Sequence, residues 1–318
     1  MQTLRALDAC PRPPEGTAVT IGAYDGVHRG HRAVIGTVRR LAEDRGLATA
    51  VVTFDRHPAS VVRPESAPRL LTDLDQKLEL LDETGVDYAL VVHFDEARSK
   101  ESAEDFVREV LVDCLNAKLV VVGADFHFGH QRRGNVALLE QMGGELGFDV
   151  LGMSLVGPDG APARDEFQVS STAIRRALIA GDLETANAML GRSYELRGIV
   201  EQGDRRGRTL GFPTANVAVP EEILLPRDGI YAARYERPSG EVLPAVVALG
   251  RRPQFYEAQP YRLLEVHVLD WDGDLYGEEA KVRFVARLRD EAKFDSVDAL
   301  LAQMQRDCDE ARRRLDGG

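Results

Sequence analysis

Hydrophobic and polar positions divide the chain into two parts that have different periodicities. In the first part, short apolar runs typical of buried strands alternate with segments whose apolar residues recur every three or four positions, as in an amphipathic helix. The predicted strands are Ala18–Gly22, Ala48–Phe54, Val86–Phe94 and Leu119–Val122; the predicted helices are Arg32–Asp44, one capped by Thr72 that ends at Glu83, and Ser102–Leu115. Strands separated by helices indicate a parallel sheet with helices on both faces.

From about Tyr194 the pattern changes to short strands with turn signals between them, which favours a β-barrel or sandwich. Strands are predicted at Tyr231–Arg234, Val242–Leu249, Tyr261–Leu269 and Lys281–Ala286. An amphipathic helix from Ser296 to about Leu315 follows, with an apolar stripe of Val297, Leu300, Leu301 and Met304. The change lies between Gly181 and Tyr194, so we expect two domains, residues 1–186 and 187–318.

Composition narrows the classes of function. The 318 residues are 44% hydrophobic and carry a formal charge of −12, which argues against a broad nucleic-acid-binding surface but permits small phosphorylated ligands. No window has the apolar run of a membrane helix, and the N-terminus lacks the order of a signal peptide, so a cytoplasmic protein is expected. The three cysteines lie far apart without metal-like spacing, and we expect free thiols at Cys10, Cys114 and Cys308.

The strongest local motif follows the first predicted strand and leads into the first predicted helix. It runs from Gly22 through Asp25, His28 and Gly30 to His31, with the sequence Gly-Ala-Tyr-Asp-Gly-Val-His-Arg-Gly-His. Open α/β sheets bind ligands at such junctions, where glycines admit a phosphate and the helix start offers free N–H groups. Two imidazoles three residues apart suit the charge that develops when an α-phosphate is attacked. A glycine-rich turn with two surface histidines is the plainer alternative.

A second motif, Ser170-Ser171-Thr172-Ala-Ile-Arg175, opens another predicted helix. Hydroxyls at a helix start commonly cap it. With Arg175 one turn further along, Ser171 and Thr172 can also bind the β- and γ-phosphates of a nucleotide, and the presence of the first motif favours that interpretation.

The second part of the chain has chemistry of its own. A loop from Gly207 through Gly211 and Pro213 reaches Thr214 and Asn216, whose hydroxyl and amide oxygens are of the type that Mg²⁺ prefers. Glu265 lies on an alternating strand, where a carboxylate can accept the proton of an attacking alcohol. The alternatives are a turn that enters a barrel strand and an exposed Glu that pairs across strands.

These motifs resemble those of the bacterial bifunctional riboflavin kinase/FAD synthetase family, in its domain order and over nearly the whole chain. The first motif differs from the usual family pattern only at Tyr24, where Phe is common. Val122–Gly129 with Arg133-Gly134 also resembles the family, as do Leu225–Tyr231, the Glu265 strand, Asp274–Gly277 and Leu288–Phe294. One departure is the stretch Ala248–Phe255, where the family often has Asn-x-Gly-x-x-Pro-Thr-Phe, and this leaves the ligand contacts of that loop open.

The resemblance implies a Rossmann-like nucleotidyltransferase domain followed by a Greek-key β-barrel with a terminal helix. It implies ATP-dependent phosphorylation of riboflavin to FMN in the barrel, then adenylylation of FMN to FAD in the first domain. By resemblance, His28 and His31 act on ATP with Gly22, Asp25, Gly30, Ser171, Thr172 and Arg175, and Asp125 faces the flavin or nucleotide. In the barrel, Gly207, Gly211 and Pro213 contact ATP, Thr214 and Asn216 hold Mg²⁺, and Glu265 is the base.

The alternative that we keep is a nucleotidyltransferase for another substrate, fused to a barrel that only binds flavin. We expect flavins and ATP as partners, with no nucleic acid and no membrane. The sequence leaves open a homo-oligomer, the relative rates of the two steps, passage of FMN between sites and a preference for reduced flavin.

Overall fold

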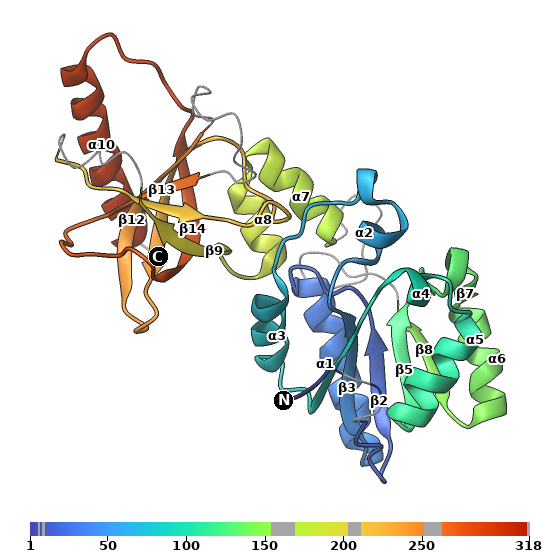
Figure 1. Ribbon diagram of the computed structural model, residues 1–318. Helices are drawn as coiled ribbons and strands as arrows, with labels where there is room; N and C mark the ends of the chain where they lie inside the picture. The colour runs from blue at the N-terminus through green and yellow to red at the C-terminus, as the bar shows by residue number, and fades with distance from the viewer. Residues whose placement is uncertain (6, 8–9, 154–168, 203–210, 251–262, 317–318) are drawn as a thin grey trace. The chain divides into compact units, whose positions relative to one another are not determined.

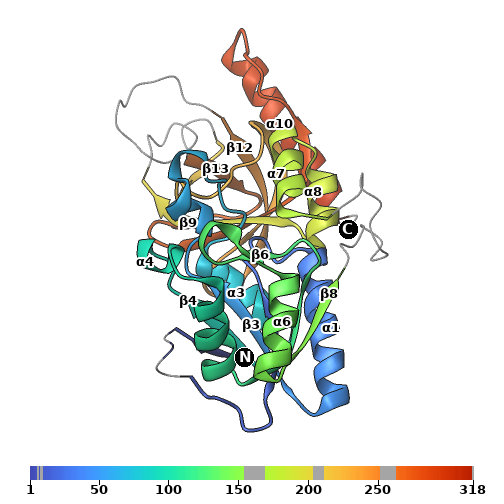
Figure 2. The same ribbon diagram turned by 90° about the vertical axis from the view of Figure 1, so that its right-hand side faces the viewer.

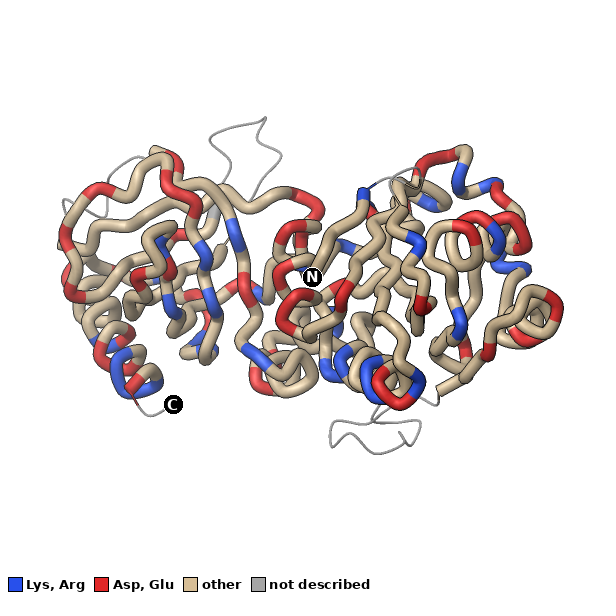
Figure 3. Tube along the Cα trace, turned by 90° about the horizontal axis from the view of Figure 1, so that it is seen from below, with Lys and Arg blue, Asp and Glu red and all other residues tan. Residues whose placement is uncertain are grey.

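The computed structural model describes residues 1–5, 7, 10–153, 169–202, 211–250 and 263–316. It contains two compact units, Met1–Ser171 and Thr172–Gly318, which are described separately below. Acidic and basic positions are interspersed along both units (Figure 3). No helix within the described ranges has the length and apolarity needed to cross a bilayer.

Strands of the first unit form a parallel sheet, which has six members in the described residues, in the order β1-β4-β3-β2-β5-β8 (Figure 1). They are β1 (Gln2–Leu4), β2 (Thr17–Ile21), β3 (Ala48–Phe54), β4 (Tyr88–Val92), β5 (Ala117–Gly123) and β8 (Asp149–Met153). The chain moves outward from β2 through β3 to β4 and then returns to place β5 on the other side of β2. Such a reversal of strand order opens a crevice beyond the carboxyl ends of the strands.

Helices cover both faces of this sheet (Figure 2). Successive side chains of its central strands point to opposite faces and most are apolar, so both faces need a cover. Val19 and Val120 pack on one face against the helices that contain Phe106 and Leu139. Ala18 and Leu119 pack on the other face against α1. The helices are α1 (Arg29–Arg45), α3 (Leu74–Asp82), α5 (Ala103–Phe106), the π-helix η3 (Val107–Cys114) and α6 (Val136–Leu146). The predicted parallel sheet with helices on both faces is confirmed.

Two helix starts differ from the prediction, and both differences affect the candidate site. Helix α1 begins at Arg29, three residues before the predicted start, because His28 caps it. Helix α3 is capped by Asp73, whose carboxylate accepts a hydrogen bond from the Gln76 N–H at 2.7 Å. The prediction that Thr72 is the cap is wrong, because the Thr72 hydroxyl bonds within the loop that follows β2.

Short elements complete the first unit. Ser102 caps α5 as expected, but the helix continues to Cys114 as a π-helix. The remaining elements are α2 (Pro58–Val62), η2 (Pro64–Ser66), α4 (Glu96–Ser99), β6 (His127–Phe128), η4 (His130–Arg132) and β7 (Gly134–Asn135).

The cysteine prediction is wrong for two of the three residues. Cys10 and Cys114 form a disulfide across 104 residues of sequence, with their Cα atoms 5.0 Å apart. Spacing along the chain could not show this pairing, because it arises only when the segment before β2 packs against η3. Cys308 is the one free thiol among the described cysteines, and it is buried.

In the second unit, the described strands close into a barrel of six, in the order β10-β13-β12-β11-β14-β9. They are β9 (Tyr194–Glu201), β10 (Ala215–Ala218), β11 (Gly229–Glu236), β12 (Val242–Leu249), β13 (Leu263–Val268) and β14 (Glu279–Arg289). All pairs are antiparallel, and β14 returns to lie beside β11 after the β11-β12-β13 meander. This order is a Greek key, as expected.

Helices α7 (Ser171–Ala180) and α8 (Leu183–Leu190) precede the barrel. Asn187 of α8 joins it through a bond from its Nδ2 to the Phe284 carbonyl at 2.9 Å and another from the Tyr194 N–H to its Oδ1 at 2.8 Å. The division of the two activities between residues 186 and 187 stays a prediction.

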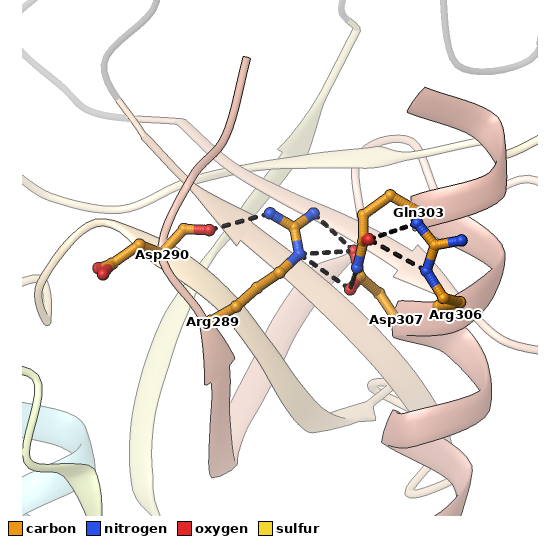
Figure 4. A network of polar contacts seen from close by, with 5 residues as sticks. All are labelled: Arg289, Asp290, Gln303, Arg306 and Asp307. Atoms are coloured by element: carbon orange, nitrogen blue, oxygen red, sulfur yellow. Dashed lines mark hydrogen bonds and ion pairs between the residues drawn. The ribbon is translucent and has the colours of Figure 1, made fainter. Parts of the chain in front are cut away.

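The terminal helix α10 (Val297–Asp316) packs on the barrel through its second half. Its buried residues are Asp307, Cys308, Ala311 and Leu315. The predicted apolar stripe is wrong at its start, because Val297 is 57% exposed. Leu300, Leu301 and Met304 are only partly buried. A polar contact also holds α10 on the barrel: the Arg289 guanidinium of β14 binds both carboxylate oxygens of Asp307, at 2.9 and 2.6 Å (Figure 4).

Candidate active sites

The loop between β2 and α1 lies at the carboxyl edge of the parallel sheet and has an unusual backbone. Tyr24, Gly26 and Val27 all have positive φ, at 51°, 83° and 35°. Positive φ is rare for a β-branched residue such as Val27, and such conformations concentrate at ligand sites, where the surrounding structure holds them. The first motif therefore forms a loop with a strained, fixed backbone conformation of the kind found at ligand sites.

Asp25 holds this loop from within. Its buried carboxylate accepts hydrogen bonds from the N–H groups of Leu71 and Thr72, at 2.9 and 3.1 Å. The Gly26 N–H in turn donates to the Thr72 hydroxyl at 3.1 Å. Backbone N–H groups thus bond to the Asp25 carboxylate, which fixes the shape of the loop.

His28 and His31 lie together at the start of α1. The Nδ1 atom of buried His28 accepts from the His31 N–H at 3.3 Å, which makes His28 the N-cap. The two rings stack with centroids 3.6 Å apart. A side chain at Gly30 would crowd both the His28 ring and the Val169 carbonyl, each 3.2 Å from the position of a Cβ. Glycine at residue 30 therefore allows both imidazoles to pack at the helix start.

The second motif meets the first through one hydrogen bond. The Ser171 hydroxyl at the first residue of α7 donates to the backbone carbonyl of Asp25 at 2.9 Å. The two motifs, which lie far apart in the sequence, are therefore in direct contact in the structure. Thr172 is exposed and Arg175 is half-buried in the second unit.

Asp125 lies just beyond β5, which is the neighbour of β2 in the sheet, and its side chain is exposed. Its carbonyl bonds to Nδ1 of His127 at 2.8 Å. Its position past the carboxyl end of a central strand is where a ligand-facing residue is expected.

Sequence reasoning missed three polar residues at this same edge. Asp55, directly after β3, accepts hydrogen bonds from the Phe94 N–H at 2.9 Å and bonds to Nδ1 of His93 at 2.6 Å. Partial burial opposes ionisation, yet these two partners hold the pKa of Asp55 below its ordinary value. The third residue is Lys77 of α3, which is almost fully buried. It lies inside α3 between buried Gln76 and Leu78, and the apolar pattern of that helix gave no signal for a buried lysine.

In the barrel, strand register brings the second candidate site together. Asn216 of β10 lies opposite Glu265 of β13 on one side and opposite Glu201 of β9 on the other. Directly opposed residues share a face of the sheet, so these three side chains form one row. Thr214 precedes Asn216 by two residues and is half-buried. Glu201 was missed in the sequence because only register shows that it belongs to this row.

Asn216 is only 5% exposed, and its Oδ1 atom has no hydrogen-bond partner in the described part of the chain. Buried polar atoms normally have partners, so an unpaired amide oxygen marks a place for a ligand. Hard cations take amide, hydroxyl and carboxylate oxygens. The donor set around Asn216 therefore fits Mg²⁺.

A cavity of about 460 Å³ lies beside this site. Phe212, Pro213, His267 and Trp271 line it, together with Gly211 and Arg312. Nδ1 of His267 lies 2.8 Å from the Pro213 carbonyl, so His267 holds the loop that leads to Thr214. Gly207 lies outside the described residues.

The chain matches two protein families in succession. Residues 10–172 match the FAD synthetase family, and residues 190–315 match the riboflavin kinase family. The chain belongs to the bifunctional riboflavin kinase/FMN adenylyltransferase family. Its activities are those of a riboflavin kinase and an FMN adenylyltransferase, which together produce FAD. The match of the barrel to riboflavin kinases decides against a barrel that only binds flavin.

Curated members of this family match nearly the full length of the chain. The enzyme of Haemophilus influenzae is 36% identical, over 98% of both chains. That of Escherichia coli K12 is 39% identical, over 93% of this chain and 91% of its own. The crystal structure of a macrolide-efflux protein from Streptococcus pneumoniae has the same fold, with a TM-score of 0.85 and 27% identity over 98% of this chain and 99% of that one.

Proposed function

We propose that the two activities use two separate sites, the loop after β2 with the start of α1, and the Asn216 row of the barrel. Riboflavin and ATP are the substrates of the barrel, and FMN and ATP are those of the first unit. The contact between Ser171 and Asp25 supports the first site. The unpaired Oδ1 of Asn216 opposite Glu265 is the observation that carries the second.

In the barrel, Glu265 accepts the proton of the ribityl 5′-hydroxyl as that oxygen attacks the γ-phosphorus of ATP. The bond from the γ-phosphorus to the bridging oxygen breaks, and ADP leaves. Thr214 and Asn216 would hold Mg²⁺, which when bound neutralises phosphate charge. Gly211 and Pro213, which line the 460 Å³ cavity, contact ATP. Gly207, outside the described residues, is assigned to ATP by its motif alone.

In the first unit, a phosphate oxygen of FMN attacks the α-phosphorus of ATP, and pyrophosphate leaves. His28 and His31 bind the phosphates at the start of α1, where the backbone N–H groups and the helix dipole favour an anion. Gly22, Asp25 and Gly30 shape this site. Ser171, Thr172 and Arg175 bind the β- and γ-phosphates, and Asp125 faces the flavin or nucleotide. Positioning and electrostatics suffice, without a protein nucleophile.

The two sites can be separated by mutation. Glu265→Ala is expected to abolish FMN formation and to leave the conversion of FMN to FAD intact. His28→Ala with His31→Ala is expected to do the reverse, so that FMN accumulates. Chromatography of flavins after incubation with riboflavin, ATP and Mg²⁺ measures both. Loss of both activities from either change in a folded protein would refute the two-site assignment. A cytoplasmic location agrees with this function and stays a prediction.

A further inference from the structure

Lys77 projects from α3 toward the carboxyl ends of two central strands. Lys77 is only 8% exposed. Its Nζ atom donates hydrogen bonds to the Phe54 carbonyl at 2.7 Å and to the Ala23 carbonyl at 3.4 Å. Phe54 ends β3, and Ala23 immediately precedes Tyr24 in the loop after β2. A single ammonium group therefore joins both strand ends.

The location of Lys77 corresponds to the point where β2 and β3 separate. The Gly22 N–H still donates to the Val52 carbonyl at 3.0 Å, as in the ladder. One residue further, the Ala23 carbonyl is bonded by side chains instead, the Thr53 hydroxyl at 3.2 Å and Lys77. The loop can leave the sheet here because these side chains replace the lost strand partner.

Burial of the Lys77 ammonium at this place carries a large free-energy cost, because a charged group is removed from water. Burial lowers the pKa of Lys77 to about 8, although the carboxylates of Asp25 and Asp55 favour its charged form. An apolar side chain of similar length would avoid the cost of removing a charge from water. Packing alone therefore does not explain why a charged residue occupies position 77. The anion that the proposed site binds supplies a reason, because a triphosphate adds negative charge to an edge that already holds two carboxylates.

We propose that Lys77 is a positioning residue for adenylyl transfer, which fixes the loop after β2 in its phosphate-binding form and balances the charge of the bound phosphates. Lys77 acts through the Ala23 and Phe54 carbonyls. This inference rests on the proposed function of the loop that contains Asp25 and His28.

The test is Lys77→Met in the full-length protein, assayed in the reverse reaction. There, pyrophosphate attacks the α-phosphorus of FAD, so that ATP forms and FMN leaves, and inorganic pyrophosphate is the probe of the phosphate site. We expect the KM for pyrophosphate to rise about tenfold or more while kcat at saturation stays within about threefold. Riboflavin kinase activity of the same protein should stay unchanged, since its site is in the other unit.

Lys118→Met is the matched control, because Lys118 lies at the opposite end of the same sheet, at the start of β5, and is exposed. A KM in Lys77→Met within about twofold of wild type would overturn the proposal. So would an equal rise in Lys118→Met, or a fall of kcat alone, which would show a merely structural role. If His28→Ala with His31→Ala left the reverse reaction intact, the proposed function itself would fail; if only Lys77→Met had no effect, this inference alone would fail.

Discussion

The hydroxyl of Ser171 donates a hydrogen bond to the backbone carbonyl of Asp25, across 146 residues of sequence. The carboxylate of the same aspartate binds the N–H groups of Leu71 and Thr72. Asp25 therefore connects three segments of the first unit: the loop after β2, the residues before α3 and the first residue of α7. The phosphate site that we propose is assembled around this residue, which need not touch the ligand itself.

Ser171→Ala should weaken FAD synthesis without affecting the kinase. Loss of one neutral hydrogen bond is worth about 1 kcal/mol, so we expect kcat/KM for the conversion of FMN to FAD to fall about fivefold, or more if the hydroxyl also binds phosphate. Initial rates of both reactions measure this. Ser99→Ala is the control, because the Ser99 hydroxyl also bonds a backbone carbonyl, that of Glu96 at 2.7 Å, in the exposed helix α4. Equal losses in the two variants would contradict the prediction.

Asn216→Leu should separate stability from activity in the barrel. An unpaired buried amide oxygen costs about 1–3 kcal/mol, so an apolar side chain of similar size is expected to stabilise the barrel while it abolishes kinase activity. Urea unfolding followed by the fluorescence of Trp271, the only tryptophan of the chain, reports on this unit. A variant with less stable folding and normal kinase activity would show that the Asn216 oxygen has a structural partner instead of a ligand.

The pH dependence of FAD formation should show the ionisation of Lys77. Its pKa is lowered to about 8 by burial, so the ammonium is present below that pH and is lost as the pH rises through it. We expect kcat/KM for FAD formation, which reflects ionisations of the free enzyme, to fall as the pH rises above about 8. The groups that face Lys77 are the carboxylates of Asp25 and Asp55, and His93 bonds the latter. Lys77→Met should lack this limb; its persistence there would assign the limb to another group.

Asp307→Ala should destabilise the second unit far more than Asp309→Ala. Asp307 is buried and binds the Arg289 guanidinium through both oxygens, whereas Asp309 pairs with Arg312 on the surface and has a side chain that is 56% exposed. Leaving Arg289 without its partner is expected to cost about 3 kcal/mol. The surface pair is expected to contribute at most about 1 kcal/mol. Trp271 fluorescence during urea unfolding measures both, and similar values would refute the anchoring role of Arg289.

Much of the fold follows from local patterns. Strand β3 occupies the predicted range, and β12 does so as well, because buried strands leave strong apolar runs. Sequence could not place the terminal helix on its partner. Its packed face contains Asp307, a charged residue that pattern analysis assigns to solvent, because the pairing with Arg289 exists only in the folded barrel.

The candidate site was predicted as far as motifs could reach. His28, His31, Asn216 and Glu265 were predicted because their neighbours form recognisable motifs, and the structure places each in the candidate site described above. Glu201 and Lys77 were missed for two different physical reasons. Glu201 joins Asn216 through strand register, a property of pairing, and Lys77 reaches the site from a helix whose own pattern describes only its packing.

His28 caps α1, in addition to the chemical role that we propose for it. An inactive enzyme made with His28→Ala would lose the cap along with the imidazole. His28→Asn would retain a side-chain acceptor for the His31 N–H while removing the imidazole ring. Anyone who wishes to study substrate binding in a catalytically silent but intact first unit should therefore begin with asparagine at this residue, and the same constraint narrows the residues that natural drift can accept there.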